Sequence, residues 1–361
     1  MVPAKLLTLG VILVSLVLGG CGAIKGSMAS APYVTNAWGW TTISDRKLTE
    51  MYVNAESQFA EVNGYTIHYR DVGRGEPVVL LHGLFSSLHG WQPWVDELKS
   101  NYRVITLDLP GFGMTGGPET EGQYSEEDAL KTIEMFIDKL GLDQFSLVGN
   151  SLGGYYAARY AMNHPDRVDQ LILSDPIGFP QKPSFVTFVG STLTAQQIGK
   201  IMQPPLVLGI GIWLTYGDDS RLDETELKRY LHFNQRRGAK QLYLDTFAFV
   251  ELINLRQEPL PFFKIAAPTL IMWGEADTMT PLEQASQWRD YIQDSKVVVY
   301  PTVGHYPVEE MPKRTVDHAR KFLQNGLEEF PDYSTPDDAN GLVATNEVRP
   351  PQPVIWNRSE Q

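Results

Sequence analysis

A serine flanked by glycines is the first feature of this sequence that could do chemistry. Residues 149–153 read GNSLG, which matches the pattern G-x-S-x-G with Ser151 at its centre. The apolar run before them is typical of a strand, and the run YYAARYAM after them is typical of a helix. Glycines on both sides leave room for a sharp strand-to-helix turn, and the helix N-terminus favours negative charge beside the serine. The segment therefore predicts a nucleophilic hydroxyl.

A serine nucleophile needs a base that accepts its proton and an acid that orients the base. His305 follows the last predicted strand, in TVGHYP, and Asp277 follows the strand before it, in WGEADTMTP. The carboxyl ends of parallel strands share one edge of a sheet, where open α/β sheets place their sites. We therefore predict a triad of Ser151, Asp277 and His305. Asp175 also follows a predicted strand and is the alternative acid.

Two backbone N–H groups are expected to stabilise the negative charge that forms when the serine attacks a carbonyl. One belongs to Leu152, directly after the nucleophile, and the other to Leu84, in the segment HGLF after a buried strand. His82 in that segment is predicted to be a structural hydrogen-bonding residue. The other histidines are not grouped as metal ligands, so no metal site and no cofactor are predicted.

Strands and helices alternate through most of the chain, as a parallel sheet covered on both faces requires. The segment QFAEVNGYTIHYRDVG alternates apolar and polar residues around Asn63-Gly64, which predicts a hairpin. Continuous apolar runs predict buried strands in EPVVLLHG, YRVITLDLPGFG, QFSLVGNS, VDQLILSDP, APTLIMWGEAD and SKVVVYPTVGH. The segments SEEDALKTIEMFIDKLG, LEQASQWRDYI and KRTVDHARKFLQNGL predict helices.

The alternation stops between Pro176 and Pro268, where the chain has a helical and unusually apolar insertion. Its segments PPLVLGIGIWLTYG and LYLDTFAFVELINL are the most hydrophobic. We interpret the insertion as a helical subdomain with its own core that also covers a pocket. The last part of the chain, rich in Pro, Asp and Asn, is expected to be irregular.

The N-terminus resembles a bacterial export signal. Lys5 precedes an apolar run over residues 6–18, which is too short for a comfortable membrane span. The run ends in Leu-Gly-Gly-Cys, which resembles a lipobox with Cys21 as the lipidated residue. An ordinary cleaved signal and an uncleaved anchor helix are the alternatives. Because Gly22 rather than aspartate follows the cysteine, we expect an exported lipoprotein of the bacterial outer membrane or cell surface.

The expected organisation has five parts. They are a signal peptide at 1–20, a lipid-anchored tether and packing segment at 21–57, an α/β core at 58–176 and 268–328, a helical cap at 177–267, and an irregular tail at 329–361. The formal net charge of −13 argues against a basic face for nucleic acid. Cys21 is the single cysteine, so no disulfide can form within the chain.

Five motifs resemble the α/β-hydrolase superfamily with a helical cap: LLHGLFSS, LDLPGFGMT, LVGNSLGG, WGEAD and VGHYPVEEMP. The resemblance covers about residues 58–325. It implies an α/β-hydrolase fold, with a mostly parallel, doubly wound sheet and an inserted cap, and the usual chain order of serine, acid and histidine. It also implies acyl transfer to water, in which His305 accepts the proton of Ser151 and Asp277 fixes the tautomer of His305. Asp108, in the D-x-P-G-x-G loop, is usually structural in such proteins.

Within the superfamily the chain resembles lipases, carboxylesterases and bacterial C–C bond hydrolases. Ser151 argues against dehalogenases and epoxide hydrolases, which use an aspartate nucleophile, and Leu152 stands where cofactor-free haloperoxidases typically have methionine. C–C hydrolases usually use a cap arginine, for which Arg236 and Arg237 are available, and a tryptophan after the histidine, where this chain has Tyr306.

The apolar composition of the insertion favours a hydrophobic acyl group, since each buried methylene contributes ~0.8 kcal/mol. We therefore predict a serine esterase or lipase that meets hydrophobic ester substrates at a membrane, to which its N-terminal lipid anchors it. A C–C bond hydrolase acting on a diketone-type acid and a non-catalytic binding protein with the same fold are the alternatives.

Overall fold

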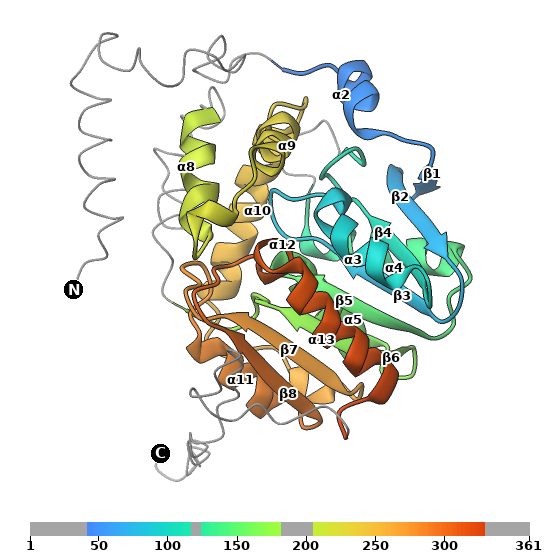
Figure 1. The fold of residues 1–361 in the computed structure, drawn as a ribbon, viewed down its shortest axis with the longest axis vertical. Coiled ribbons are helices and arrows are strands. Elements are labelled where there is room, and N and C mark those ends of the chain that lie inside the picture. The colour runs from blue at the N-terminus through green and yellow to red at the C-terminus, as the bar shows by residue number, and fades with distance from the viewer. Residues whose placement is uncertain (1–41, 117–123, 182–204, 329–361) are drawn as a thin grey trace, which may run out of the picture.

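The computed structural model describes residues 42–116, 124–181 and 205–328 (Figure 1). The predicted signal peptide, Cys21 and the tail from residue 329 lie outside these residues, as do parts of the predicted tether and cap. None of the helices in the three described ranges is long and apolar enough to cross a membrane.

An eight-stranded sheet forms the centre of the fold, in the order β1-β2-β4-β3-β5-β6-β7-β8 (Figure 1). The β1–β2 and β2–β4 pairs are antiparallel, and every later pair is parallel. The strands are β1 (Ser57–Val62), β2 (Tyr65–Gly73), β3 (Pro77–Leu81), β4 (Arg103–Leu107), β5 (Phe145–Asn150), β6 (Val168–Ser174), β7 (Thr269–Gly274) and β8 (Ser295–Tyr300). The mostly parallel sheet predicted from the sequence is confirmed.

The predicted hairpin joins β1 to β2. Asn63 and Gly64 both have positive φ angles, of 49° and 82°, as the tight turn between twisted strands requires. The antiparallel pair lies at one end of the sheet and leaves the parallel strands in its middle, where both faces can be covered.

Helices cover both faces of the sheet, which explains the continuous apolar runs. In β3, Val79 and Leu81 belong to one hydrophobic cluster, and Val78 and Leu80 to the other, because successive side chains of a strand point to opposite faces. Helices α4 (Glu126–Lys139), α5 (Leu152–Asn163) and α11 (Glu283–Tyr291) contribute to the first cluster, and α3 (Gln92–Leu98) and α13 (Pro312–Asn325) to the second. The sheet is therefore doubly wound.

A helical insertion separates β6 from β7. It contains α8 (Pro205–Thr215), α9 (Glu224–Asn234), α10 (Ala239–Asn254) and the short 3-10 helices η3 (Asp219–Arg221) and η4 (Phe262–Lys264). A capping box of Asp223 and Glu226 begins α9. Tyr230 of α9 packs against Tyr306, which follows β8, and Tyr243 of α10 packs against Phe85, which follows β3. The insertion therefore lies over the carboxyl ends of the strands.

The segment before the sheet contains a helix that the sequence analysis did not predict, α2 (Asp45–Tyr52). Ser44 caps it, and Leu48 is its one buried side chain. Tyr52 packs against Phe233 of α9 with ring centroids 4.6 Å apart, and its hydroxyl is 2.7 Å from Nδ1 of His232. This segment is therefore packed onto the insertion.

Candidate active site

The turn between β5 and α5 carries Ser151. This residue has φ 54° and ψ −116°, an unusual conformation for a residue other than glycine. A Cβ atom on Gly149 would lie 2.3 Å from the carbonyl oxygen of Gly153, and one on Gly153 would lie 2.3 Å from that of Leu81. Only glycine fits at these two positions. The tight turn is therefore built to hold the serine between a strand and a helix.

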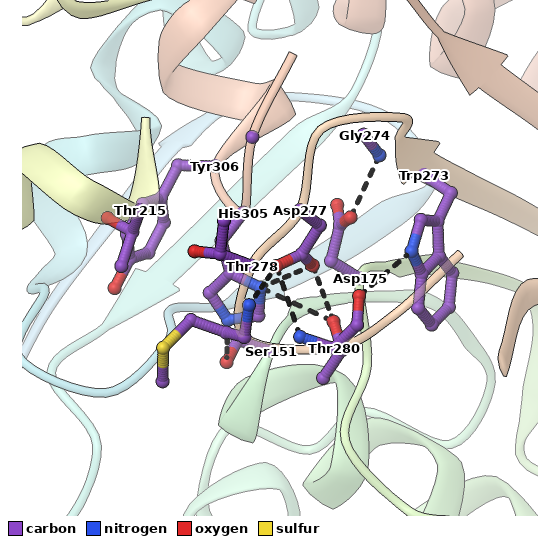
Figure 2. A network of polar contacts seen from close by, with 12 residues as sticks. Ser151, Asp175, Thr215, Trp273, Gly274, Asp277, Thr278, Thr280, His305 and Tyr306 are labelled. Atoms are coloured by element: carbon purple, nitrogen blue, oxygen red, sulfur yellow. Dashed lines mark hydrogen bonds and ion pairs between the residues drawn. The ribbon is translucent and has the colours of Figure 1, made fainter. Parts of the chain in front are cut away.

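The structure brings Ser151, His305 and Asp277 together (Figure 2). His305 follows β8, and its Nε2 lies 2.7 Å from Oγ of Ser151. Its Nδ1 lies 2.7 Å from Oδ2 of Asp277, which follows β7. Ser151 and His305 are only 5% and 2% exposed, so the hydrogen-bonded chain is shielded from bulk water.

The surroundings of Asp277 define the tautomer of His305. Oδ1 of Asp277 accepts hydrogen bonds from the backbone N–H groups of Met279 and Thr280, at 2.6 and 3.1 Å. Its Oδ2 accepts one from the Thr280 hydroxyl at 2.5 Å. A carboxylate with these donors is an acceptor toward His305, whose Nδ1 therefore carries the proton. Nε2 is left free to accept the proton of Ser151.

The backbone of His305 is also held on both sides. Its N–H donates to the carbonyl oxygen of Thr215, at the end of α8, at 2.8 Å. Its own carbonyl accepts a hydrogen bond from Nδ2 of Asn150, the residue before the nucleophile, at 3.3 Å. The insertion and the nucleophile turn thus position the imidazole together.

Asp175, the alternative acid, lies beside the triad but does not bond to the histidine. Its Oδ1 accepts from the N–H of Gly274 at 2.9 Å, and its Oδ2 from the hydroxyl of Ser174 at 3.1 Å. Burial and the neighbouring Asp277 raise the pKa of Asp175 well above its usual range. Within the described residues, Asp175, Asp277 and His305 are the one group close enough to hold a metal ion, and they are the acid end of the triad.

The two predicted oxyanion donors belong to segments that adjoin the nucleophile. Leu152 is the first residue of α5, so its N–H has no acceptor within the helix. Leu84 follows β3, and its N–H donates to none of the described residues. A Cβ on the adjacent Gly83 would lie 3.1 Å from Cβ of Ser151, which places this loop directly against the nucleophile. The hydroxyl of Tyr306 donates to the Leu84 carbonyl at 3.1 Å and holds the loop in place.

The sequence analysis missed Glu309, which joins three parts of the molecule. It lies in VEEMP, close after His305, and its side chain is only 3% exposed. Its carboxylate accepts hydrogen bonds from one residue of the oxyanion loop and three of the insertion: Ser86 at 3.1 Å, Tyr216 at 3.3 Å, Arg229 at 3.1 Å and Tyr230 at 3.0 Å. The signal in the sequence was its place in the motif VGHYPVEEMP, four residues after His305.

His82 and Asp108, which lie in two of the motifs, form hydrogen bonds that hold neighbouring loops. Nδ1 of His82 donates to its neighbour's carbonyl, that of Gly83, at 2.8 Å, and its Nε2 accepts from the N–H of Leu109 at 3.0 Å. Asp108 is buried and accepts from Nδ1 of His68 at 2.7 Å and from the N–H of Leu88 at 2.8 Å. Both side chains therefore fix the loops around the site.

Comparisons with known proteins agree with this geometry. The model of the alpha/beta hydrolase fold matches residues 76–203, and that of the TAP-like proteins matches residues 255–335. These matches agree with the α/β-hydrolase fold of the structure, and they support a hydrolase.

Three similar proteins differ in the reactions that their names describe. The 2-hydroxy-6-oxo-6-(2'-aminophenyl)hexa-2,4-dienoic acid hydrolase of Metapseudomonas resinovorans is 25% identical, over 74% of this chain and 90% of its own. A membrane phospholipase A, described as a novel bacterial virulence factor, has a solved structure that superposes with a TM-score of 0.58. Its sequence is 26% identical, and the match covers 89% of this chain and 99% of the phospholipase chain. A thermophilic esterase from Thermogutta terrifontis is 25% identical with a TM-score of 0.63, over 74% of this chain and 99% of its own.

Proposed function

We propose that this protein is a serine hydrolase that cleaves carboxylic esters with a hydrophobic acyl group. The observation that carries the proposal is the pair of 2.7 Å hydrogen bonds that link Ser151 to His305 and His305 to Asp277. With a glycine-flanked nucleophile and two backbone N–H groups beside it, this arrangement is suited to acyl transfer.

The reaction begins when Oγ of Ser151 attacks the ester carbonyl while Nε2 of His305 accepts its proton. Asp277 stabilises the imidazolium that forms, and it remains ionised. The N–H groups of Leu84 and Leu152 hold the oxyanion of the tetrahedral intermediate, where one such donor typically contributes ~3 kcal/mol.

His305 then gives its proton to the departing alkoxide, and the alcohol leaves the acyl-enzyme. A water molecule attacks the acyl carbonyl as His305 accepts one of its protons. The second tetrahedral intermediate collapses when His305 returns that proton to Oγ of Ser151, and the carboxylic acid is released.

A lipid-like substrate is supported by the composition of the chain and by one relative. The insertion contains the uncharged helix α8, whose sequence is PLVLGIGIWLT. Cys21 and the apolar run before it suit a lipid anchor at the bacterial outer membrane or cell surface. The membrane phospholipase A is similar over 89% of this chain, more than the 74% of the esterase. These points favour a membrane-anchored enzyme that acts on esters of the lipid phase.

A second candidate, cleavage of a C–C bond in a dienoic acid, is supported by Arg236. Its guanidinium donates to the carbonyl oxygen of Gly111, and among the described residues it makes no ion pair. Burial lowers the pKa of Arg236, and its Nε has no hydrogen-bond partner. A buried cation of this kind suits a substrate carboxylate. Tyr306, where C–C hydrolases usually have tryptophan, favours the ester reaction instead.

The two candidates are separated by parallel assays of the wild-type protein, Ser151→Ala and Arg236→Met. p-Nitrophenyl esters from acetyl to palmitoyl and a dispersed phospholipid test the first, and 2-hydroxy-6-oxo-6-phenylhexa-2,4-dienoate tests the second. We expect ester hydrolysis that favours octanoyl over acetyl, is lost in Ser151→Ala and changes little in Arg236→Met. Cleavage of the dienoate alone, lost in both variants, would establish the second candidate. Failure of a fluorophosphonate to label folded wild-type protein would instead show a non-catalytic binding protein.

A further inference from the structure

A second buried carboxyl group lies next to the triad acid. Asp175 follows β6, the strand between β5, which precedes the nucleophile, and β7, which precedes Asp277. Its side chain is fully buried, and its oxygens lie within 4.8 Å of ligand atoms of both Asp277 and His305 (Figure 2). Its φ of 44° is uncommon outside glycine, and this turn aims the carboxyl group at the site. The position suits a functional group more than a core residue.

The hydrogen bonds decide which of the two acids carries the charge. Asp277 accepts from the N–H groups of Met279 and Thr280, from the Thr280 hydroxyl and from His305. Asp175 accepts only from Gly274 and Ser174. Two adjacent buried carboxyl groups cannot both be ionised at a low energetic cost. Asp175 therefore retains a proton, which it can donate to the ionised Asp277.

We propose that Asp175 is a second acid of the triad, which positions Asp277 in the wild-type enzyme and replaces it as the partner of His305 when Asp277 is removed. The proposal rests on the serine hydrolase activity proposed above. In Asp277→Ala, burial still raises the pKa of Asp175 but the neighbouring negative charge is gone, and the proton of Asp175 passes to solvent as its carboxylate pairs with the imidazole. The resulting carboxylate faces the imidazole from within 4.8 Å across the space left by the deleted side chain. No other atom is transferred.

The test compares four variants of the full chain: Asp175→Asn, Asp277→Ala, Asp277→Asn and the double variant Asp175→Asn/Asp277→Ala. We expect Asp175→Asn to lower kcat, but by less than Asp277→Ala does, because asparagine tolerates a positive φ and its amide can donate to Asp277 in place of the carboxyl proton. We expect Asp277→Ala to lose at most ~100-fold in kcat, while the double variant loses ~10⁴-fold, the loss typical of a triad without its acid.

Asp277→Asn is the matched control. Its amide fills the space of the carboxylate and donates to Nδ1 of His305, so Asp175 cannot approach and a loss of ~10⁴-fold is expected. If Asp175 had a purely structural role, Asp277→Ala would be no more active than the double variant. Equal loss in Asp277→Ala and in the double variant would overturn the proposal.

The rate at which a fluorophosphonate labels Ser151 supplies a readout that needs no substrate. Labelling that follows the expected order, with Asp277→Ala faster than both Asp277→Asn and the double variant, supports the second acid even when no ester tested is hydrolysed. Absent labelling of wild-type protein would instead refute the serine hydrolase itself. The thermal unfolding midpoint of each variant verifies that the fold is retained.

Discussion

Glu309 should hold the helical insertion on the sheet, and its replacement by alanine should destabilise the whole protein. The Arg229 side chain is 11% exposed and that of Glu309 is 3% exposed, so this ion pair, with a separation of 3.1 Å, is largely out of water. The pKa of Arg229 is raised by the carboxylate of Glu309, although burial alone would lower it. Glu309→Ala leaves the guanidinium buried without this partner.

The expected magnitude follows from the removal of one partner of a buried pair, which typically lowers the free energy of unfolding by ~3–5 kcal/mol. At ~2 °C per kcal/mol, the lower end of the range for domains of about 150–250 residues, the midpoint of thermal unfolding falls by ~6–10 °C. The kcat for ester hydrolysis should fall as well, because the Ser86 hydroxyl of the oxyanion loop loses its acceptor.

Scanning calorimetry or fluorimetry of Glu309→Ala, Arg229→Met and the double variant Arg229→Met/Glu309→Ala measures this effect. The double variant should be more stable than Glu309→Ala, since no charge is left unpaired. Glu283→Gln, at an exposed position, is the control and should change stability by less than ~0.5 kcal/mol. A midpoint shift below ~2 °C in Glu309→Ala, or strictly additive effects, would refute the reasoning.

Three further predictions concern the nucleophile, its turn and the pH. Ser151→Ala should lower kcat for ester hydrolysis by at least ~10⁴-fold without changing the unfolding midpoint. Gly153→Ala should prevent folding, because its Cβ would lie 2.3 Å from the Leu81 carbonyl oxygen. Burial lowers the pKa of His318 to about 4, so acid should destabilise the fold. The contribution of neutral His318 to the free energy of unfolding is complete above the unfolded pKa of ~6.5. It decreases by ~1.4 kcal/mol for each pH unit between pH ~6.5 and pH ~4.

Each of these three predictions has a control. For Ser151→Ala, the contradicting outcome is unchanged ester hydrolysis, which would show that another group is the nucleophile. Gly211→Ala is the counterpart of Gly153→Ala, because its Cβ would meet nothing within 4 Å, and this variant should fold. For the pH effect, denaturant unfolding at pH 6.5 and pH 5 should show a loss of stability that is ~2 kcal/mol smaller in His318→Gln. Equal losses in both proteins would rule out His318 as the cause.

The local pattern of the chain was enough to predict the strands and the nucleophile turn. Short continuous apolar runs bounded by turn residues, such as PVVLL of β3, are typical of strands buried on both faces. The segment GNSLG between such a run and a helix has few structural alternatives. The same reasoning placed His305 and Asp277 after the last two strands. Helix α2 was missed because it is only eight residues long and buries one side chain, which is a short pattern to detect.

The choice between acids and the role of Glu309 depended on the tertiary structure. Asp175 and Asp277 both follow strands, and adjacent strands bring both to one place, so the sequence by itself determined only that an acid would be available. The loop after β7, with Thr280 bonded to Asp277, decided which carboxylate meets Nδ1 of His305. Glu309 and Ser86 meet only in the folded chain. Hydrogen bonds extend over about 3 Å, and only folding brings residues from distant parts of the chain within that distance.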